Sequence, residues 1–181
     1  MKTLILSICI LCIGLVIIGG CTSTTSQSST ISTITNSPSD IVTPAAQTNY
    51  HDLSLIALKI SDFPDGWQVQ KEPTVKPDSY DSQFSTTQPG VVDVIQHIQQ
   101  YSTIEEAEIS YNQDKAKITD YKIDQVNLGD AGYGYIISGD SAYVVFRSGN
   151  IITTIRYYGS FGETLSINDA QQYASIIAAR I

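Results

Sequence analysis

Three thiols are the first side chains along the chain that could take part in covalent chemistry. Cys9 and Cys12 have the spacing of a redox pair, but both lie inside an apolar run over residues 4–18 with no strand before them. We therefore treat that spacing as chance. Cys21 follows two glycines at the end of the run, and a signal peptidase requires narrow side chains of this kind before its cleavage site.

The order Ile18-Gly19-Gly20-Cys21 resembles a lipobox, the end of a lipoprotein signal peptide. This resemblance implies cleavage between Gly20 and Cys21 and a diacylglycerol group in thioether linkage on the Cys21 sulfur. The alternative is an uncleaved transmembrane helix, because the apolar run approaches the roughly 18 to 20 residues that span a bilayer. Both interpretations place the remaining chain outside the cytoplasm. We expect a signal peptide at residues 1–20 and a membrane anchor through lipid on Cys21.

Side chains suited to acid–base or metal chemistry are isolated from one another in the sequence. His97 lies on the more polar side of a predicted strand, and His51 has no obvious second ligand. Asp78 and Asp81 lack the glycine and terminal glutamate of a calcium loop. The chain has no phosphate loop and no Gly-x-Ser-x-Gly, and no cysteine remains after processing as a nucleophile. We therefore expect no catalytic residue, no metal, no cofactor and no enzymatic activity.

Aromatic and arginine side chains alternate along a predicted hairpin whose two-residue loop is Gly149-Asn150. This loop places Tyr143 opposite Arg156, where a cation–π contact is possible. The same register puts four polar or aromatic side chains on one sheet face, and these form the candidate binding face: Tyr143, Arg147, Arg156 and Tyr158. This face is either covered by a helix or open. If it is open, it forms a groove for a small ligand or for the edge of a partner protein.

A second hairpin is predicted just before the first, with Gly139-Asp140 as a two-residue loop. Counting back from that loop puts Tyr133 and Tyr135 on the opposite face, together with Val144 and Phe146. The same count puts Ile136 on the face of the arginines.

Composition limits the classes of partner and the number of domains. The 181 residues carry a net charge of −8, so the protein has no electrostatic footprint for nucleic acid. Residues 21–49 are rich in serine and threonine and form a linker that cannot bury enough surface to fold. Residues 50–181 form one domain outside the cytoplasm, long enough to fold on apolar burial without disulfides.

The pattern over residues 50–181 predicts an α+β fold: an antiparallel sheet with two main helices, arranged as a three-layer sandwich. A helix is predicted from the capping residues Ser102 and Thr103 to Ile118, and another over residues 165–181. The second of these supplies the cover for the Tyr/Arg face. The other predicted elements are a short helix or strand over 50–67, a polar loop over 76–90, and strands over 67–71, 91–101, 121–128 and, in three runs, 131–158.

Four segments together resemble small uncharacterised lipoproteins of archaea and bacteria. They are Asp62-Phe63-Pro64-Asp65-Gly66-Trp67, Glu105-Glu106-Ala107, Gly129-Asp130-Ala131 and the run from Phe146 to Ile152. The order of predicted elements is similar to Mog1/PsbP-like domains, and that similarity implies an assembly or binding factor without known catalytic residues.

These observations favour a lipid-anchored binding or assembly module that faces outside the cytoplasm and engages a protein or a small molecule. The first alternative is a structural envelope lipoprotein without a ligand pocket. A hydrolase is the remaining possibility that the sequence leaves open.

Overall fold

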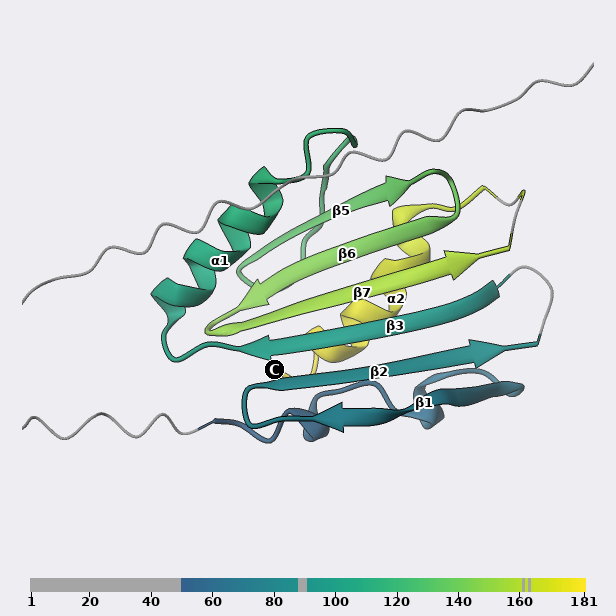
Figure 1. Cartoon of the computed structure of the whole chain (residues 1–181), viewed down its shortest axis with the longest axis horizontal. Helices are drawn as coiled ribbons and strands as arrows, with labels where there is room; N and C mark the ends of the chain where they lie inside the picture. The colour runs from purple at the N-terminus through teal and green to yellow at the C-terminus, as the bar shows by residue number, and fades with distance from the viewer. Residues whose placement is uncertain (1–49, 88–90, 161, 163) are drawn as a thin grey trace, which may run out of the picture. The chain divides into compact units, whose positions relative to one another are not determined.

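A seven-stranded antiparallel sheet with two helices forms the described part of the chain, an α+β fold as predicted (Figure 1). The structure, a computed structural model, describes residues 50–181 except 88–90, 161 and 163. The predicted signal peptide and linker lie outside these residues. The strands are β1 (Trp67–Val75), β2 (Ser79–Thr86), β3 (Val91–Gln100), β4 (Asp124–Gln125), β5 (Ala131–Ile137), β6 (Ser141–Ser148) and β7 (Ile151–Gly159).

The sheet order is β1-β2-β3-β7-β6-β5-β4, so the last strand of the chain lies at the centre beside β3. Helix α1 (Ile104–Ala116) joins β3 to the β4–β7 half of the sheet, and α2 (Ile167–Ala178) ends the chain. Two short 3₁₀ turns, η1 (Leu53–Leu55) and η2 (Ile60–Asp62), precede β1. No helix among the described residues combines the length and the apolar character needed to cross a membrane.

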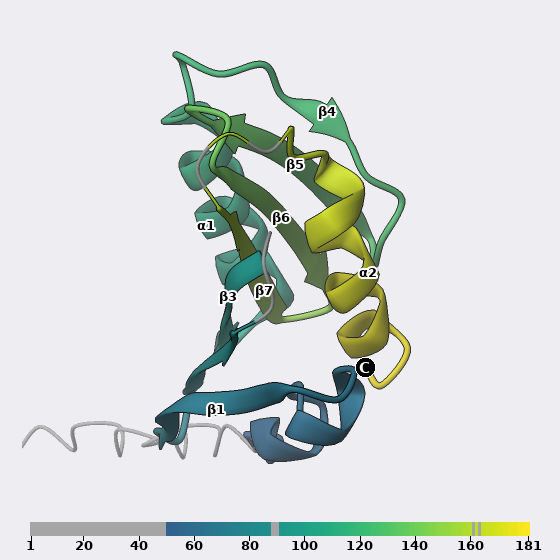
Figure 2. The same cartoon turned by 90° about the vertical axis from the view of Figure 1, so that its right-hand side faces the viewer.

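The two helices lie on opposite sides of the sheet, which gives the predicted three layers (Figure 2). We call the two sides of the sheet the α1 face and the α2 face. On the α2 face, Val144, Phe146 and Ile155 are fully buried against Ala174 and Ile177. The prediction that the C-terminal helix covers the Tyr/Arg face is therefore wrong. The most apolar helix packs on the most apolar face of the sheet, since that arrangement removes the most hydrocarbon from water.

Helix α2 begins as its sequence predicts. The Asp169 carboxylate accepts a hydrogen bond from the backbone N–H of Ser166 at 2.7 Å, which satisfies a donor at the helix start. Four apolar side chains at helical spacing are buried: Ala170, Tyr173, Ala174 and Ile177.

Helix α1 covers only part of the other face. Thr103 caps it by accepting a hydrogen bond from Glu106 N–H at 3.1 Å. Ala107 and Tyr111 are its buried residues, whereas Ile104 is 58% exposed. A helix with two buried side chains cannot shield a whole sheet face, so the far end of the α1 face stays open.

The segment before β1 packs under the β2–β3 part of the α2 face. It forms two separate turns, so the continuous short helix predicted over residues 50–67 is wrong. The buried amide of Gln96 accepts from Leu58 N–H at 2.8 Å and donates to the Leu58 carbonyl at 3.2 Å. These two hydrogen bonds satisfy backbone groups that would otherwise be buried without partners.

Strand β2 occupies most of the predicted polar loop. Tyr80 and Phe84 are buried on the α2 face, where they lie opposite Ile98 and Val94 of β3. Strand β1 likewise continues through Pro73 to Val75, beyond the predicted end at residue 71. A proline is tolerated there because β1 is an edge strand with irregular pairing. The strand predicted over residues 121–128 is reduced to the two residues of β4.

The two hairpins differ in how well their registers were predicted. The β6–β7 register agrees with the prediction, with Ser148 opposite Ile151 and Tyr143 opposite Arg156. In the β5–β6 hairpin, Ile137 lies opposite Ser141, so the loop has three residues, 138–140, and not two. One extra loop residue turns every side chain of β5 to the other face.

That correction moves Tyr133 and Tyr135 onto the α1 face and Ile136 onto the α2 face. Tyr133 lies opposite Val145, and Tyr135 lies opposite Tyr143. The α1 face therefore carries more tyrosine than the sequence predicts.

Candidate binding face

The open end of the α1 face brings together Tyr135, Tyr143, Arg156 and Tyr158. Tyr135 comes from β5, Tyr143 from β6, and the other two from β7. The antiparallel register places Tyr135, Tyr143 and Arg156 directly beside one another on three neighbouring strands. All four side chains are partly exposed, because α1 covers the other end of these strands.

The Arg156 guanidinium lies between two tyrosine rings. Its carbon Cζ is 3.7 Å from the ring centroid of Tyr158 and 5.1 Å from that of Tyr143. The ring of Tyr143 stacks in turn on Tyr135, with centroids 4.7 Å apart and planes 6° from parallel. The predicted contact between Tyr143 and Arg156 is therefore present, and the guanidinium is held by ring faces.

Hydrogen bonding leaves the Arg156 guanidinium largely unsatisfied. Its one hydrogen bond among the described residues runs from Nη2 to the Ser141 hydroxyl at 3.4 Å, and its buried Nε has no partner. A guanidinium offers five N–H donors in a planar fork suited to a carboxylate. Arg156 therefore keeps most of its donor capacity for another molecule.

The phenols of Tyr135 and Tyr143 remain neutral at ordinary pH. Burial raises the pKa of Tyr135 to about 12, and the neighbouring Tyr143 adds to the effect while Arg156 opposes it. Burial also raises the pKa of Tyr143, again against the positive charge of Arg156. Both hydroxyl groups can therefore donate hydrogen bonds as well as accept them.

Arg147 does not belong to this cluster, although the sequence places it there. It is on the α1 face, but it lies opposite Ile152 at the other end of the strands. Its Nη1 donates to the Asp130 carboxylate and to the Gly149 carbonyl, both at 3.1 Å. With its side chain only 12% exposed, Arg147 closes the hairpin loop and is not available to a ligand.

A hollow of about 230 Å³ lies between α1 and the tyrosines. Tyr133, Tyr135 and Tyr143 line its sheet side, and Asp114 lines it from α1. Tyr133 is 2% exposed and packs against Tyr111 of α1 at 5.2 Å between ring centroids. The hollow therefore has a well-packed inner end, and Tyr143, which also lines it, lies beside Arg156.

His97 and Asp81 make a close pair on the α1 face of β3 and β2. The imidazole Nδ1 lies 2.6 Å from the Asp81 carboxylate. Among the described residues, no hydroxyl or thiol is hydrogen bonded to the other ring nitrogen, so the pair lacks a nucleophile. The described residues also contain no group of three or more side chains that could hold a metal, and Asp78 lies apart from any such set.

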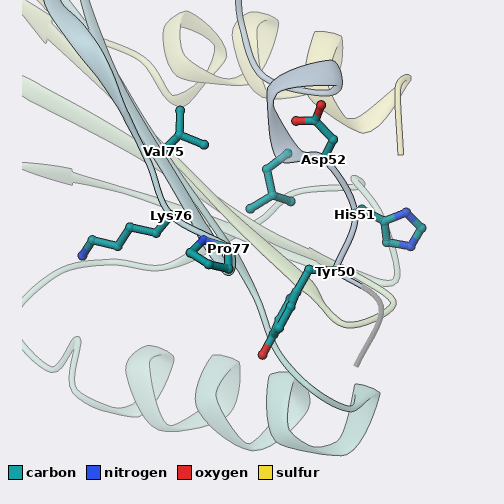
Figure 3. A pocket seen from close by; sticks show the side chains of 7 residues that line it. Tyr50, His51, Asp52, Val75, Lys76 and Pro77 are labelled. Atoms are coloured by element: carbon teal, nitrogen blue, oxygen red, sulfur yellow. The ribbon is translucent and has the colours of Figure 1, made fainter. Parts of the chain in front are cut away.

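Another hollow, of about 450 Å³, lies at the other side of the domain, between residues 50–53 and the β1–β2 turn. Figure 3 shows that its polar side chains diverge: His51 and Lys76 point away from each other, and Tyr50 lies near Pro77. A ligand in this hollow would meet no converging set of polar groups. We therefore assign no site there.

The predicted lipidation site, Cys21, and the predicted cleavage point after Gly20 lie outside the described residues. No protein-family model matches the chain, and no curated protein or solved structure is significantly similar to it. The resemblance to small lipoproteins and to Mog1/PsbP-like domains stays a prediction.

Proposed function

We propose that the protein is a lipid-anchored binding module that faces outside the cytoplasm and captures its ligand at the open end of the α1 face. One observation carries the proposal. Of the three arginines in the chain, Arg147 pairs with Asp130 and Arg180 pairs with Asp62, whereas the described residues offer Arg156 no carboxylate within 4 Å. In a chain with a net charge of −8, this arginine without a carboxylate partner lies beside partly exposed tyrosines, and both residue types are enriched at interfaces.

The residue types of this face agree with a binding role. Tyrosine and arginine dominate the energetics of many interfaces, because they combine a large contact area with directional hydrogen bonds. Here the rings hold the guanidinium in place before a ligand arrives, which lowers the entropy that binding would cost.

A photo-crosslinking residue in place of Tyr158 tests this part of the proposal in cells that express the full chain. We expect an adduct of reproducible mass that disappears when Arg156→Ala is added. The same crosslinker at Ile109, an exposed position on α1, is the control and should give no such adduct. Lys76→Ala removes one positive charge elsewhere and should leave the Tyr158 adduct intact.

The anchor part of the proposal rests on the residues before the domain. Two acyl chains hold a protein on a membrane far longer than one does, because each buried methylene contributes about 0.8 kcal/mol. We expect labelled fatty acid on the wild-type chain and none on Cys21→Ser, which should also leave the membrane fraction if the leader is removed. Recovery of the intact protein with Met1 in place would refute the anchor.

A structural envelope lipoprotein is the second candidate, and the divergent side chains of the hollow beside residues 50–53 favour it (Figure 3). This candidate predicts no adduct at Tyr158 that depends on Arg156. The proposal includes no catalytic activity. Turnover in a broad hydrolase screen that His97→Ala abolishes would overturn that part.

A further inference from the structure

Resting on the proposed function, we propose that the ligand is an acidic polysaccharide that lies across the strands of the α1 face. The structure contains a continuous row of six side chains that runs perpendicular to the strands. Each of six neighbouring strands contributes one side chain. Each member is the cross-strand partner of the next: Tyr135, Tyr143, Arg156, Ile95, Gln83 and Lys71.

The row is at least partly exposed to solvent along its whole length. None of its six members is buried, and Lys71 at the β1 end is exposed. Neighbouring strands are about 4.8 Å apart, so the row extends for about 24 Å. This length fits a linear polymer of several units and exceeds what one small molecule would need.

A hollow lies at each end of the row. The hollow of about 230 Å³ beside α1 is lined by Tyr135 and Tyr143, and a hollow of about 310 Å³ beside β1 is lined by Lys71, Gln83 and Ile95. Arg156 stands between them. An elongated ligand could therefore place one unit in each hollow while its middle crosses Arg156.

The two cations of the row call for negative charge on the ligand. Arg156 and Lys71 both lack a carboxylate partner within 4 Å among the described residues, and three strand spacings, about 14 Å, separate them. A polymer with carboxylates at intervals can meet both cations at once. Two linked contacts raise the affinity well above that of either contact alone.

The other polar groups of the two hollows call for hydroxyls on the same ligand. Asp114 lines one hollow and pairs with Lys117 at 2.7 Å, and Asp81 lines the other and pairs with His97 at 2.6 Å; in each carboxylate one of these bonds leaves other lone pairs free. A carboxylate only accepts hydrogen bonds, so these two groups suit a donor such as a sugar hydroxyl and repel further negative charge. The neutral phenols of Tyr135 and Tyr143 can donate to or accept from the same hydroxyls. A sugar acid supplies both kinds of group, whereas a plain polyanion supplies only one.

An acidic peptide fits the arrangement less well. Extended peptides bind sheets by adding a strand at an edge, where backbone groups are free. This row crosses the sheet face, and one edge strand, β1, contains Pro73, which has no N–H to donate, and pairs irregularly. A peptide that lay along the row would leave its backbone groups without partners from the sheet.

The test is calorimetric titration of the full chain in detergent with a galacturonate hexamer. Its fully methyl-esterified form is the first control, since it keeps the sugar backbone and removes the charge. Poly-glutamate of similar length is the second, and a galacturonate dimer, too short to reach from Arg156 to Lys71, is the third.

We expect the hexamer to bind, the ester to bind at least about tenfold more weakly, and poly-glutamate to bind more weakly than the hexamer. Arg156→Ala should weaken binding of both hexamer and dimer by at least about tenfold. Replacement of the exposed Lys71 by alanine (Lys71→Ala) should weaken binding of the hexamer several-fold and leave binding of the dimer unchanged. Lys76→Ala, an equal loss of charge outside the row, should change neither.

Three results would overturn the inference. Equal binding of the ester and the acid would show that the ligand's charge makes no contribution. If Lys71→Ala and Lys76→Ala changed hexamer binding equally, the row would not be the binding site. Tighter binding of poly-glutamate, still dependent on Arg156, would reject the glycan but leave the binding module in place. If the crosslinker at Tyr158 gave no adduct in cells, or one that Arg156→Ala left unchanged, the proposed function itself would be rejected.

Discussion

The two ends of the α1 face carry the same kinds of residue in different states. At the covered end, Tyr133 is buried under α1, and Arg147 is tied to Asp130. At the open end, Tyr158 and Arg156 are partly exposed, and no carboxylate among the described residues pairs with the arginine. Both ends belong to the same strands, so the difference comes from their neighbours: α1 covers Tyr133, and Asp130 pairs with Arg147.

This comparison separates stability from binding on one surface. A tyrosine or arginine that is buried and hydrogen bonded contributes to folding, whereas one that is exposed and unpaired can be removed with little cost to the fold. Residue type alone therefore does not identify a site. The partners of each side chain decide its role.

The largest expected effect is at the covered end. Tyr133→Ala should lower the free energy of unfolding by about 3 to 5 kcal/mol, because it leaves a large cavity beside Tyr111. Tyr158→Ala should lower it by about 1 kcal/mol or less, since the ring is partly exposed. Urea denaturation of both variants measures the difference. Equal losses would show that α1 does not divide the face as described.

The sequence was sufficient for the parts of the fold that depend on local patterns. The α+β class, both helices and the β6–β7 register follow from capping residues, helical spacing and a two-residue loop. The β5–β6 register did not follow, because Ser138 adopts a positive φ of 52°. A non-glycine residue in that conformation extends the loop to three residues, and nothing in the local sequence indicates it.

Strand β2 was missed for a different reason. Its inward-facing residue between Tyr80 and Phe84 is Ser82, which lies opposite the buried Gln96. Polar residues in a core make a strand look like a loop in the sequence. They are tolerated here because Gln96 binds both the Ser82 hydroxyl and the backbone of Leu58, a contact 38 residues away in the chain.

The candidate face was found in part. The hairpin register correctly placed Tyr143, Arg156 and Tyr158 together, but it could not show that Arg147 would be paired with Asp130. It also missed Tyr135, because the β5 register was wrong by one residue. The spacing of residues along a strand predicts which face they share, and only the other elements decide which end stays open.

The next effect compares the two arginines. Arg147→Ala should lower the free energy of unfolding by about 1 to 2 kcal/mol, because it removes the Nη1 hydrogen bonds to the Gly149 carbonyl and to Asp130, which then keeps only its bond from the Gly149 N–H. Arg156→Ala should cost about 0.5 to 1 kcal/mol, the value of an exposed cation–π contact. Thermal and urea unfolding provide the measurement. The reverse order would mean that Arg156 is the structural arginine of the pair.

Alkaline pH should weaken the covered end. Burial raises the pKa of Tyr111 to about 12 in the folded protein, above its value of about 10 in an unfolded chain. The folded state therefore holds this proton more tightly, and stability is fully present below pH 10 and is lost as pH rises toward 12. At pH 11 the loss from Tyr111 should be about 1 kcal/mol. Urea midpoints at pH 9 and 11 test this, and Tyr111→Phe should reduce the difference between them.

The smallest expected effect is on the pKa values of one tyrosine at each end of the α1 face. Arg156 lowers the pKa of Tyr143, and Arg147 lowers that of Tyr111, each by its positive charge. Removing either arginine should therefore raise the pKa of its own tyrosine. NMR titration of tyrosine labelled at Cζ resolves the two groups. If the ends are electrostatically separate, Arg156→Ala will leave Tyr111 unchanged and Arg147→Ala will leave Tyr143 unchanged. A rise in both pKa values from either variant would show that the whole face titrates as one unit.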